Sequence, residues 1–85
     1  MLPLVAAIDQ TDPTPLYMQL ADILRDDIES GRLAVGEPVP SETYLQQQHG
    51  LSRVTVRKAI ALLREQGLVY TIQARGTFVR RPDPG

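Results

Sequence analysis

Apolar residues recur at helical spacing in the segment that follows Pro15. The stripe consists of Leu16, Leu20, Ile23, Leu24 and Ile28. This spacing predicts an amphipathic helix over about residues 15–30, with one face directed at a core. Thr14 is expected to cap this helix and Pro15 to occupy its first position. Gly31 is expected to end it in a left-handed conformation.

A connector rich in glycine and proline leads from this helix to a second, shorter one. Gly36, Pro38 and Pro40 disfavour a helix here, because each proline restrains both itself and the residue before it. Ser41 is the expected N-cap of a helix over about residues 42–49 that places Leu45 inward and ends at Gly50. Glu42 is interpreted as a residue favoured by the positive end of this helix dipole.

The third helix is predicted over residues 52–66, with Ser52 as its cap and Gly67 as its end. One face is apolar and is expected to pack inward; it carries Val56, Ala59, Ile60 and Leu63. Val54, Arg57, Lys58 and Ala61 lie toward the other face. The helix therefore has a basic side that points away from the core.

After Gly67 the periodicity changes to that of strands. Residues 68–72 and 77–79 are strand-like, and Ala74, Arg75 and Gly76 lie at the turn between them. The chain is therefore predicted to be mainly α with a small β-hairpin (α+β): a winged helix-turn-helix of three helices and a C-terminal wing. The domain covers residues 14–80. Residues 1–13 are an N-terminal tail whose apolar start is either free or an extra packing strand, and residues 81–85 are a tail or the start of a linker to an absent effector domain.

Size and composition limit the classes of function that the chain can have. Eighty-five residues suit one domain, and 42% hydrophobic residues with 22% charged residues are typical of a globular protein. With no cysteine and a single histidine, His49, the chain offers no convincing catalytic set, metal site or cofactor site. No apolar run is long enough to cross a membrane. We expect a cytoplasmic protein that is not an enzyme.

The net charge of −1 conceals a strong asymmetry along the chain. Residues 1–50 contain two basic and eight acidic side chains, which gives −6, whereas residues 51–85 contain seven basic and two acidic ones, which gives +5. Because phosphates respond to the local field and not to the average, the second half remains suited to nucleic acid.

The start of the third helix carries the chemistry expected of a recognition helix in the major groove. Arginine donates two hydrogen bonds to guanine, hydroxyls suit phosphates or bases, and a valine methyl contacts a thymine methyl. The side chains concerned are Ser52, Arg53, Val54, Thr55, Arg57 and Lys58. The free backbone N–H groups at a helix start also favour phosphate, and Ser41 offers the same arrangement. Arg75 places a further positive charge in the wing, residues 69–79, which is expected at the minor groove.

The order and spacing of these segments resemble the N-terminal winged helix-turn-helix domain of the GntR transcription regulators. The resemblance covers about residues 15–79. It rests on the segments Pro15-Leu16-Tyr17, Gln19-Leu20, Ile28, Gly31 to Leu33, Gly36 to Glu42, Ser52-Arg53, Thr55-Val56-Arg57, Gly67-Leu68 and Arg75 to Val79. Each segment is weak alone, and together they are highly specific. Many members carry glycine where this chain has Ala74, which weakens the expectation for the wing.

The resemblance implies a transcription regulator, usually a repressor, that binds a pseudo-palindromic double-stranded DNA operator as a homodimer. It implies release by a small-molecule effector, provided that the full protein has a C-terminal domain. It also implies contacts from the start of the second helix, the start of the third helix and the wing tip. These contacts fall on Ser41, Thr43, Ser52, Arg53, Val54, Thr55, Arg57, Gln73, Ala74, Arg75 and Gly76.

Other interpretations remain open at this point. The basic residues of the third helix also fit a solvated surface, and Gly76 also fits a simple turn requirement. Tyr17, Tyr44, Tyr70 and Phe78 are expected to pack in the core or at its rim, and not to stack on bases. The alternative function is a winged-helix module that binds protein or RNA.

Overall fold

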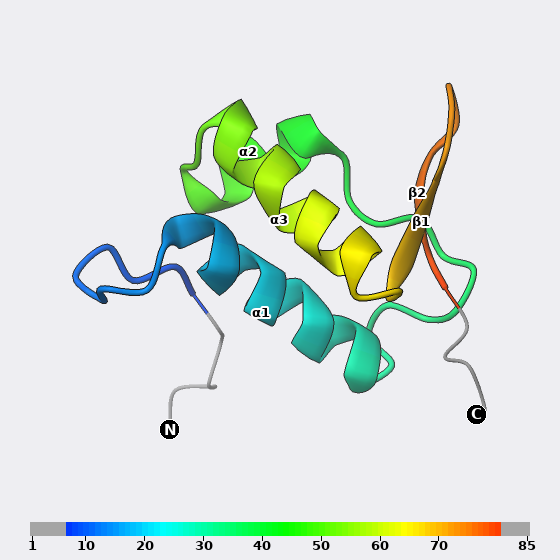
Figure 1. Ribbon diagram of the computed structural model, residues 1–85, viewed down its shortest axis with the longest axis horizontal. Coiled ribbons are helices and arrows are strands. Elements are labelled where there is room, and N and C mark those ends of the chain that lie inside the picture. Colours follow the sequence, from blue (N-terminus) through cyan, green and yellow to red (C-terminus); the bar gives the residue numbers. More distant parts are fainter. Residues whose placement is uncertain (1–6, 81–85) are drawn as a thin grey trace.

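The computed structural model of the protein describes residues 7–80, so the predictions for residues 1–6 and 81–85 lie outside the described residues. Three helices precede a hairpin (Figure 1); they are α1 (Leu16–Glu29), α2 (Glu42–His49) and α3 (Arg53–Glu65), followed by β1 (Val69–Ile72) and β2 (Gly76–Val79). The type and order of these elements confirm the predicted winged helix-turn-helix.

The core lies where α1 and α2 pack against α3 and the base of the hairpin. The predicted inner face of α3, Val56, Ala59, Ile60 and Leu63, is buried as expected. It meets Leu20, Ala21 and Leu24 of α1, Leu45 of α2, and Val39, Leu51, Val69 and Val79. These are aliphatic side chains and alanines, so the scaffold is held by dispersion and apolar burial.

The start of α1 differs from the prediction. The helix begins at Leu16 with Pro15 as its N-cap, and no side chain caps it. Thr14 is one residue too early, and its carbonyl oxygen accepts a hydrogen bond from Gln19 Nε2 at 2.9 Å. The Gln19 amide also bonds both backbone groups of Asp9. One side chain of the first turn therefore anchors residues 9–14 in place of a hydroxyl cap.

The ends of the helices follow the predicted glycines. Gly31, Gly50 and Gly67 all have positive φ, at 86°, 65° and 77°. After α3, the Gly67 N–H donates to the Arg64 carbonyl and the Leu68 N–H to the Leu63 carbonyl, which is the Schellman arrangement. This reverses the chain directly into β1. None of the helices in residues 7–80 has the length and apolarity that a membrane crossing requires.

The hairpin is antiparallel, and the connector between α1 and α2 lies against its second strand. Val69 pairs with Val79, and Ile72 pairs with Gly76. The connector adds an isolated bridge between Pro38 and Phe78. Its N–H groups at Gly36 and Val39 donate to the carbonyls of Val79 and Thr77, at 2.9 and 2.7 Å. The sequence pattern predicted this segment only as non-helical, and the structure shows it as a partial third strand.

Candidate nucleic-acid interface

Ser52 builds the start of α3 as predicted. Its backbone is extended, with φ −73° and ψ 159°, and its Oγ accepts a hydrogen bond from the Thr55 N–H. The Ser52 hydroxyl also donates to Thr55 Oγ1 at 2.9 Å. Both hydroxyls are therefore engaged in the cap, which fixes the first turn of the helix.

Three further side chains in this first part of α3, those of Arg53, Val54 and Arg57, point into solvent. The exposed fractions are 65% for the side chain of Arg53, 57% for that of Arg57 and 66% for Val54. An apolar residue as exposed as Val54 contributes little to the core. The helix thus presents two guanidinium groups and an aliphatic side chain outward together, while Val56 and Ala59 hold its opposite face in the core.

Glu42 lies beside both arginines. Arg57 Nε approaches its two carboxylate oxygens at 3.2 and 3.3 Å, and Arg53 Nε lies 3.7 Å from Oε1. The sequence pattern assigned Glu42 to the dipole of α2 and gave no sign of these contacts, because no local spacing relates a residue of α2 to one fifteen positions later. The pairs are exposed, so each contributes at most about 1 kcal/mol to stability. Their main effect is to orient the arginines and reduce their local charge.

The start of α2 lies next to this cluster. Ser41 caps the helix by accepting a hydrogen bond from the Tyr44 N–H at 3.1 Å, and Thr43 is exposed. Both positions were predicted as DNA contacts. The helix start directs its free N–H groups and positive dipole end outward, which suits a phosphate.

Lys58 is directed away from the arginines. Its Nζ lies 5.6 Å from the centre of the Tyr17 ring, so the ammonium group rests against the start of α1. The predicted contact residues of α3 therefore separate into two groups. Arg53 and Arg57 lie beside Glu42 of α2, and Lys58 lies toward α1.

The tip of the hairpin carries the remaining predicted contacts. Gln73, Ala74, Arg75 and Gly76 are all exposed. The Arg75 N–H donates to the Ile72 carbonyl at 3.0 Å and closes the turn. Ala74 has φ 67°, and within residues 7–80 it is the one non-glycine residue with positive φ. The turn therefore imposes on Ala74 the conformation for which glycine is favoured.

An open groove of about 620 Å³ runs between the start of α2, the part of α3 at Ile60 and Arg64, and the hairpin. Ser41, Glu42 and Thr43 lie along one wall, and Ala74, Arg75 and Gly76 along the other. The structure thus brings the predicted residues of α2 and of the wing to the same surface. A groove open along its length suits an extended polymer strand better than an enclosed small molecule.

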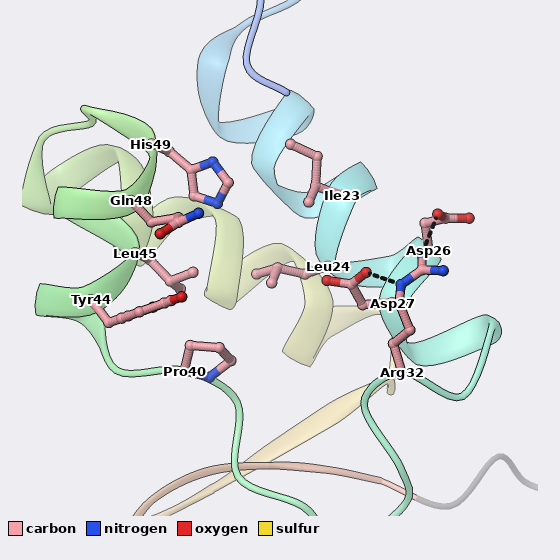
Figure 2. A pocket seen from close by; sticks show the side chains of 10 residues that line it. All are labelled: Ile23, Leu24, Asp26, Asp27, Arg32, Pro40, Tyr44, Leu45, Gln48 and His49. Carbon is pink, nitrogen blue, oxygen red and sulfur yellow. Dashed lines mark hydrogen bonds and ion pairs between the residues drawn. The ribbon is translucent and has the colours of Figure 1, made fainter. Parts of the chain in front are cut away.

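A second cleft, of about 490 Å³, lies between α1 and α2 (Figure 2). At one end Arg32 donates hydrogen bonds to Asp27 and Asp26, each at 2.8 Å, and the bond that it donates to Asp27 is the main cause that raises the pKa of Arg32. At the other end Tyr44 is 52% exposed, so the expectation that it packs in the core or at the rim is wrong. Because the guanidinium group of Arg32 is paired with acids, this cleft lacks the free positive charge that a phosphate needs.

The other aromatic residues agree better with the expectation that they pack in the core or at its rim. Tyr17 and Phe78 are half-buried. Tyr70 is 39% exposed and stacks on Phe78 with ring centres 5.8 Å apart. This pair stabilises the face of the hairpin that points away from the helices.

The chain matches known regulators over nearly all of its described length. A family model described as bacterial regulatory proteins, gntR family, matches residues 16–79. The HTH-type transcriptional repressor NagR of Bacillus subtilis (strain 168) is 41% identical over 75 residues, which are 88% of this chain and 31% of NagR. The mannosyl-D-glycerate transport/metabolism system repressor MngR of Escherichia coli (strain K12) is 47% identical over 66 residues, 78% of this chain and 28% of MngR. The chain thus spans less than a third of the length of these relatives.

Solved structures show the same architecture. YtrA of Sulfolobus acidocaldarius, described as a GntR-family transcription factor, superposes with a TM-score of 0.84 at 32% identity and covers 93% of this chain and 83% of its own. The DNA-binding domain of AraR in complex with operator ORE1 gives a TM-score of 0.77 at 38% identity, with 87% and 90% of the two chains covered. The chain belongs to the GntR family of bacterial regulatory proteins.

Proposed function

We propose that this chain binds double-stranded DNA sequence-specifically as the operator-reading domain of a GntR-type transcription regulator, and that this regulator is a repressor. The observation that carries the proposal is the start of α3, where Arg53, Val54 and Arg57 are exposed together on a helix fixed by a buried opposite face. A recognition helix inserts its N-terminal side chains into the major groove. The likeness to an AraR domain described in complex with its operator supports the same assignment.

The three side chains offer complementary chemistry to base edges. Each arginine presents a planar fork that matches the N7 and O6 acceptors of guanine, and Val54 offers methyl groups to a thymine methyl. Glu42 keeps the two guanidinium groups in extended positions beside α2. Pre-ordering of this kind reduces the side-chain entropy lost on binding.

The remaining predicted residues position the duplex. We assign Ser41, Thr43, Ser52 and Thr55 to phosphates near the two helix starts, and Lys58 to the backbone on the side of α1. The hairpin tip, Gln73 to Gly76, reaches the adjacent minor groove, where Arg75 meets its negative potential. The open groove between α2, α3 and the hairpin accommodates the sugar-phosphate strand that separates the two grooves.

The assembly follows from the geometry of half-sites. One domain reads one half-site, and a homodimer reads a pseudo-palindromic operator with half-sites about one helical turn apart. Because DNA is the ligand, we place the protein in the cytoplasm. A small-molecule effector enters the scheme only through a further domain of a longer protein.

A titration at two salt concentrations tests the proposal. Duplexes are selected from a random pool with this chain, and the preferred duplex is compared with a scrambled one and with an RNA duplex of the same sequence. We expect the selected DNA to bind most tightly and its affinity to fall with salt, because phosphate contacts release counterions. Equal affinity for selected and scrambled DNA, or preference for the RNA duplex, contradicts the proposal.

Two charge-matched variants locate the interface. Arg53→Ala should weaken binding to the selected duplex by about 1–3 kcal/mol and relax the preference at one base pair. Arg32→Ala removes the same charge from the cleft between α1 and α2 and should leave affinity nearly unchanged. If both variants lose equal affinity, the effect is one of net charge, and the assignment of Arg53 to a base fails.

A further inference from the structure

The hairpin projects from the helical body (Figure 1) with buried side chains only at its base. Val69 and Val79 are each 1% exposed, whereas Thr71, Ile72 and the turn residues are exposed. Apolar packing therefore fixes the base of the hairpin. The direction of its outer part depends on polar contacts. The position of the tip depends on which groups hold the middle of the two strands.

One side chain from α3 holds the middle of the hairpin. Arg64 donates from Nε and Nη2 to Thr71 Oγ1, at 3.2 and 2.9 Å. Thr71 Oγ1 lies 3.0 Å from Thr77 Oγ1, its cross-strand partner, so one guanidinium group engages a hydroxyl pair that joins both strands. This pair lies directly before Ile72↔Gly76, the last pair of the hairpin.

The two edges of the hairpin are held differently. On the β2 edge, the connector donates to Thr77 and Val79 and accepts from the Val79 N–H. On β1, beyond the buried Val69, Arg64 of α3 holds the strand by the two hydrogen bonds that it donates to Thr71. Removal of the Arg64–Thr71 hydrogen bonds takes away the polar link between α3 and the middle of β1, and the outer part of the hairpin can then turn about its buried base and the connector.

We propose that Arg64 is a positioning residue that acts through Thr71 and Thr77 to set the angle of the wing, and thereby where Arg75 meets the minor groove. This inference rests on the wing contact proposed above. The turn lies about three residues beyond Thr71, or roughly 10 Å at 3.3 Å per residue. A rotation of about 10° at the hydroxyl pair therefore moves the tip by about 2 Å, which exceeds the tolerance of a hydrogen bond.

The position of Arg64 argues against a direct contact with bases. Twelve residues separate it from Ser52, so it lies about 18 Å along the helix axis from the turn that enters the groove. Its fork is also occupied by a neutral hydroxyl, which accepts two of its hydrogen bonds. The geometry suits a link between helix and wing.

Three variants separate positioning from direct phosphate binding. Arg64→Lys keeps the charge and loses the planar guanidinium group, Arg64→Ala loses both, and Thr71→Val keeps the shape and loses the hydroxyl. The double variant combines Arg64→Lys with Thr71→Val. Affinity for the selected duplex, its dependence on salt, and hydroxyl-radical protection of the flanking minor groove are measured for each variant, for the double variant and for Arg75→Ala. Thermal unfolding monitors the fold.

Each single variant should weaken binding about threefold to tenfold, which is the effect of removing one hydrogen bond between the wing and the duplex. The protection of the minor groove should fall with an unchanged salt slope, and the double variant should bind no worse than either single one. If Arg64→Lys binds as the parent does while Arg64→Ala lowers the salt slope by about 0.9, Arg64 contacts a phosphate and the inference is wrong. The inference is also wrong if Thr71→Val leaves the affinity and the minor-groove protection unchanged. If Arg75→Ala leaves both quantities unchanged, the proposed wing contact itself is refuted.

Discussion

Replacement of Ala74 by glycine should stabilise this domain, although it removes a side-chain atom. Ala74 has φ 67° at the exposed tip of the hairpin, in the left-handed region that costs an L-residue about 1–2 kcal/mol. Glycine adopts this conformation without that cost. It loses more backbone entropy on folding, which amounts to about 0.5–1 kcal/mol. The difference predicts a net gain of about 0.5–1 kcal/mol.

Thermal unfolding measures this gain. In a domain of this size, 1 kcal/mol corresponds to roughly 4–8 °C in Tm, so Ala74→Gly should raise Tm by about 2–8 °C. Hydrogen exchange of the Arg75 amide, which bonds the Ile72 carbonyl across the turn, gives a local measure. Its protection should increase in the variant, because the turn opens less often.

Ala34 provides a matched control. Like Ala74 it is exposed and lies in a turn, where its carbonyl accepts a hydrogen bond from the Glu37 N–H, but its φ is not positive. Ala34→Gly should therefore lower stability by about 0.4–1 kcal/mol, chiefly through the unfolded state. If Ala74→Gly lowers Tm as Ala34→Gly does, Ala74 is not held in the left-handed region and the reasoning is refuted.

Four other predictions concern the cap of α3, the charge and the shape of the interface, and the titration of Asp9. Ser52→Ala should cost about 1 kcal/mol in unfolding free energy, since its Oγ caps α3, and an unchanged urea midpoint would contradict this role. Glu42→Gln should strengthen binding to scrambled DNA more than to the selected duplex, because it frees two arginines; titration of both duplexes checks this. Val54→Ala should change stability by less than about 0.5 kcal/mol and abolish any preference for thymine over deoxyuridine in the selected duplex. The hydrogen bond from the Thr11 hydroxyl is the main cause that lowers the pKa of Asp9 below 3.8. The contribution of this carboxylate to stability is therefore present above pH 3.8 and is lost as the pH falls through the pKa of Asp9 in the folded protein. An NMR titration midpoint of Asp9 at or above 3.8 would contradict this.

The elements that the sequence predicted correctly are those that local chemistry determines. Ser41 and Ser52 cap their helices because a hydroxyl at that position reaches an N–H three residues later. The buried face of α3 follows from helical spacing, and Gly67 ends that helix because its positive φ suits glycine. The error at Thr14 is also local in origin. A longer side chain, Gln19, provides the hydrogen bonds that a cap would have supplied.

Contacts between segments distant in the sequence could not be predicted from such local patterns. Glu42 and Arg57 meet because α2 crosses the start of α3, and Arg64 meets Thr71 because a tight turn folds β1 back along the helix. Neither pair has a spacing that marks it in the sequence. The exposure of Tyr44 has the same origin, since α2 buries a single residue, Leu45, and leaves its other faces to solvent.

The connector explains how three separate segments come to form one surface. Pro38 and Pro40 exclude a helix and leave the Val39 N–H between them as the donor to the Thr77 carbonyl, at 2.7 Å. Two residues later Ser41 caps α2, and the adjacent Glu42 holds Arg57 of α3. Residues 39–42 therefore contact the wing, start one helix and orient the other. A change in the connector must move all three together, so its rigidity, and not only the chemistry of the exposed side chains, determines how the interface fits a duplex.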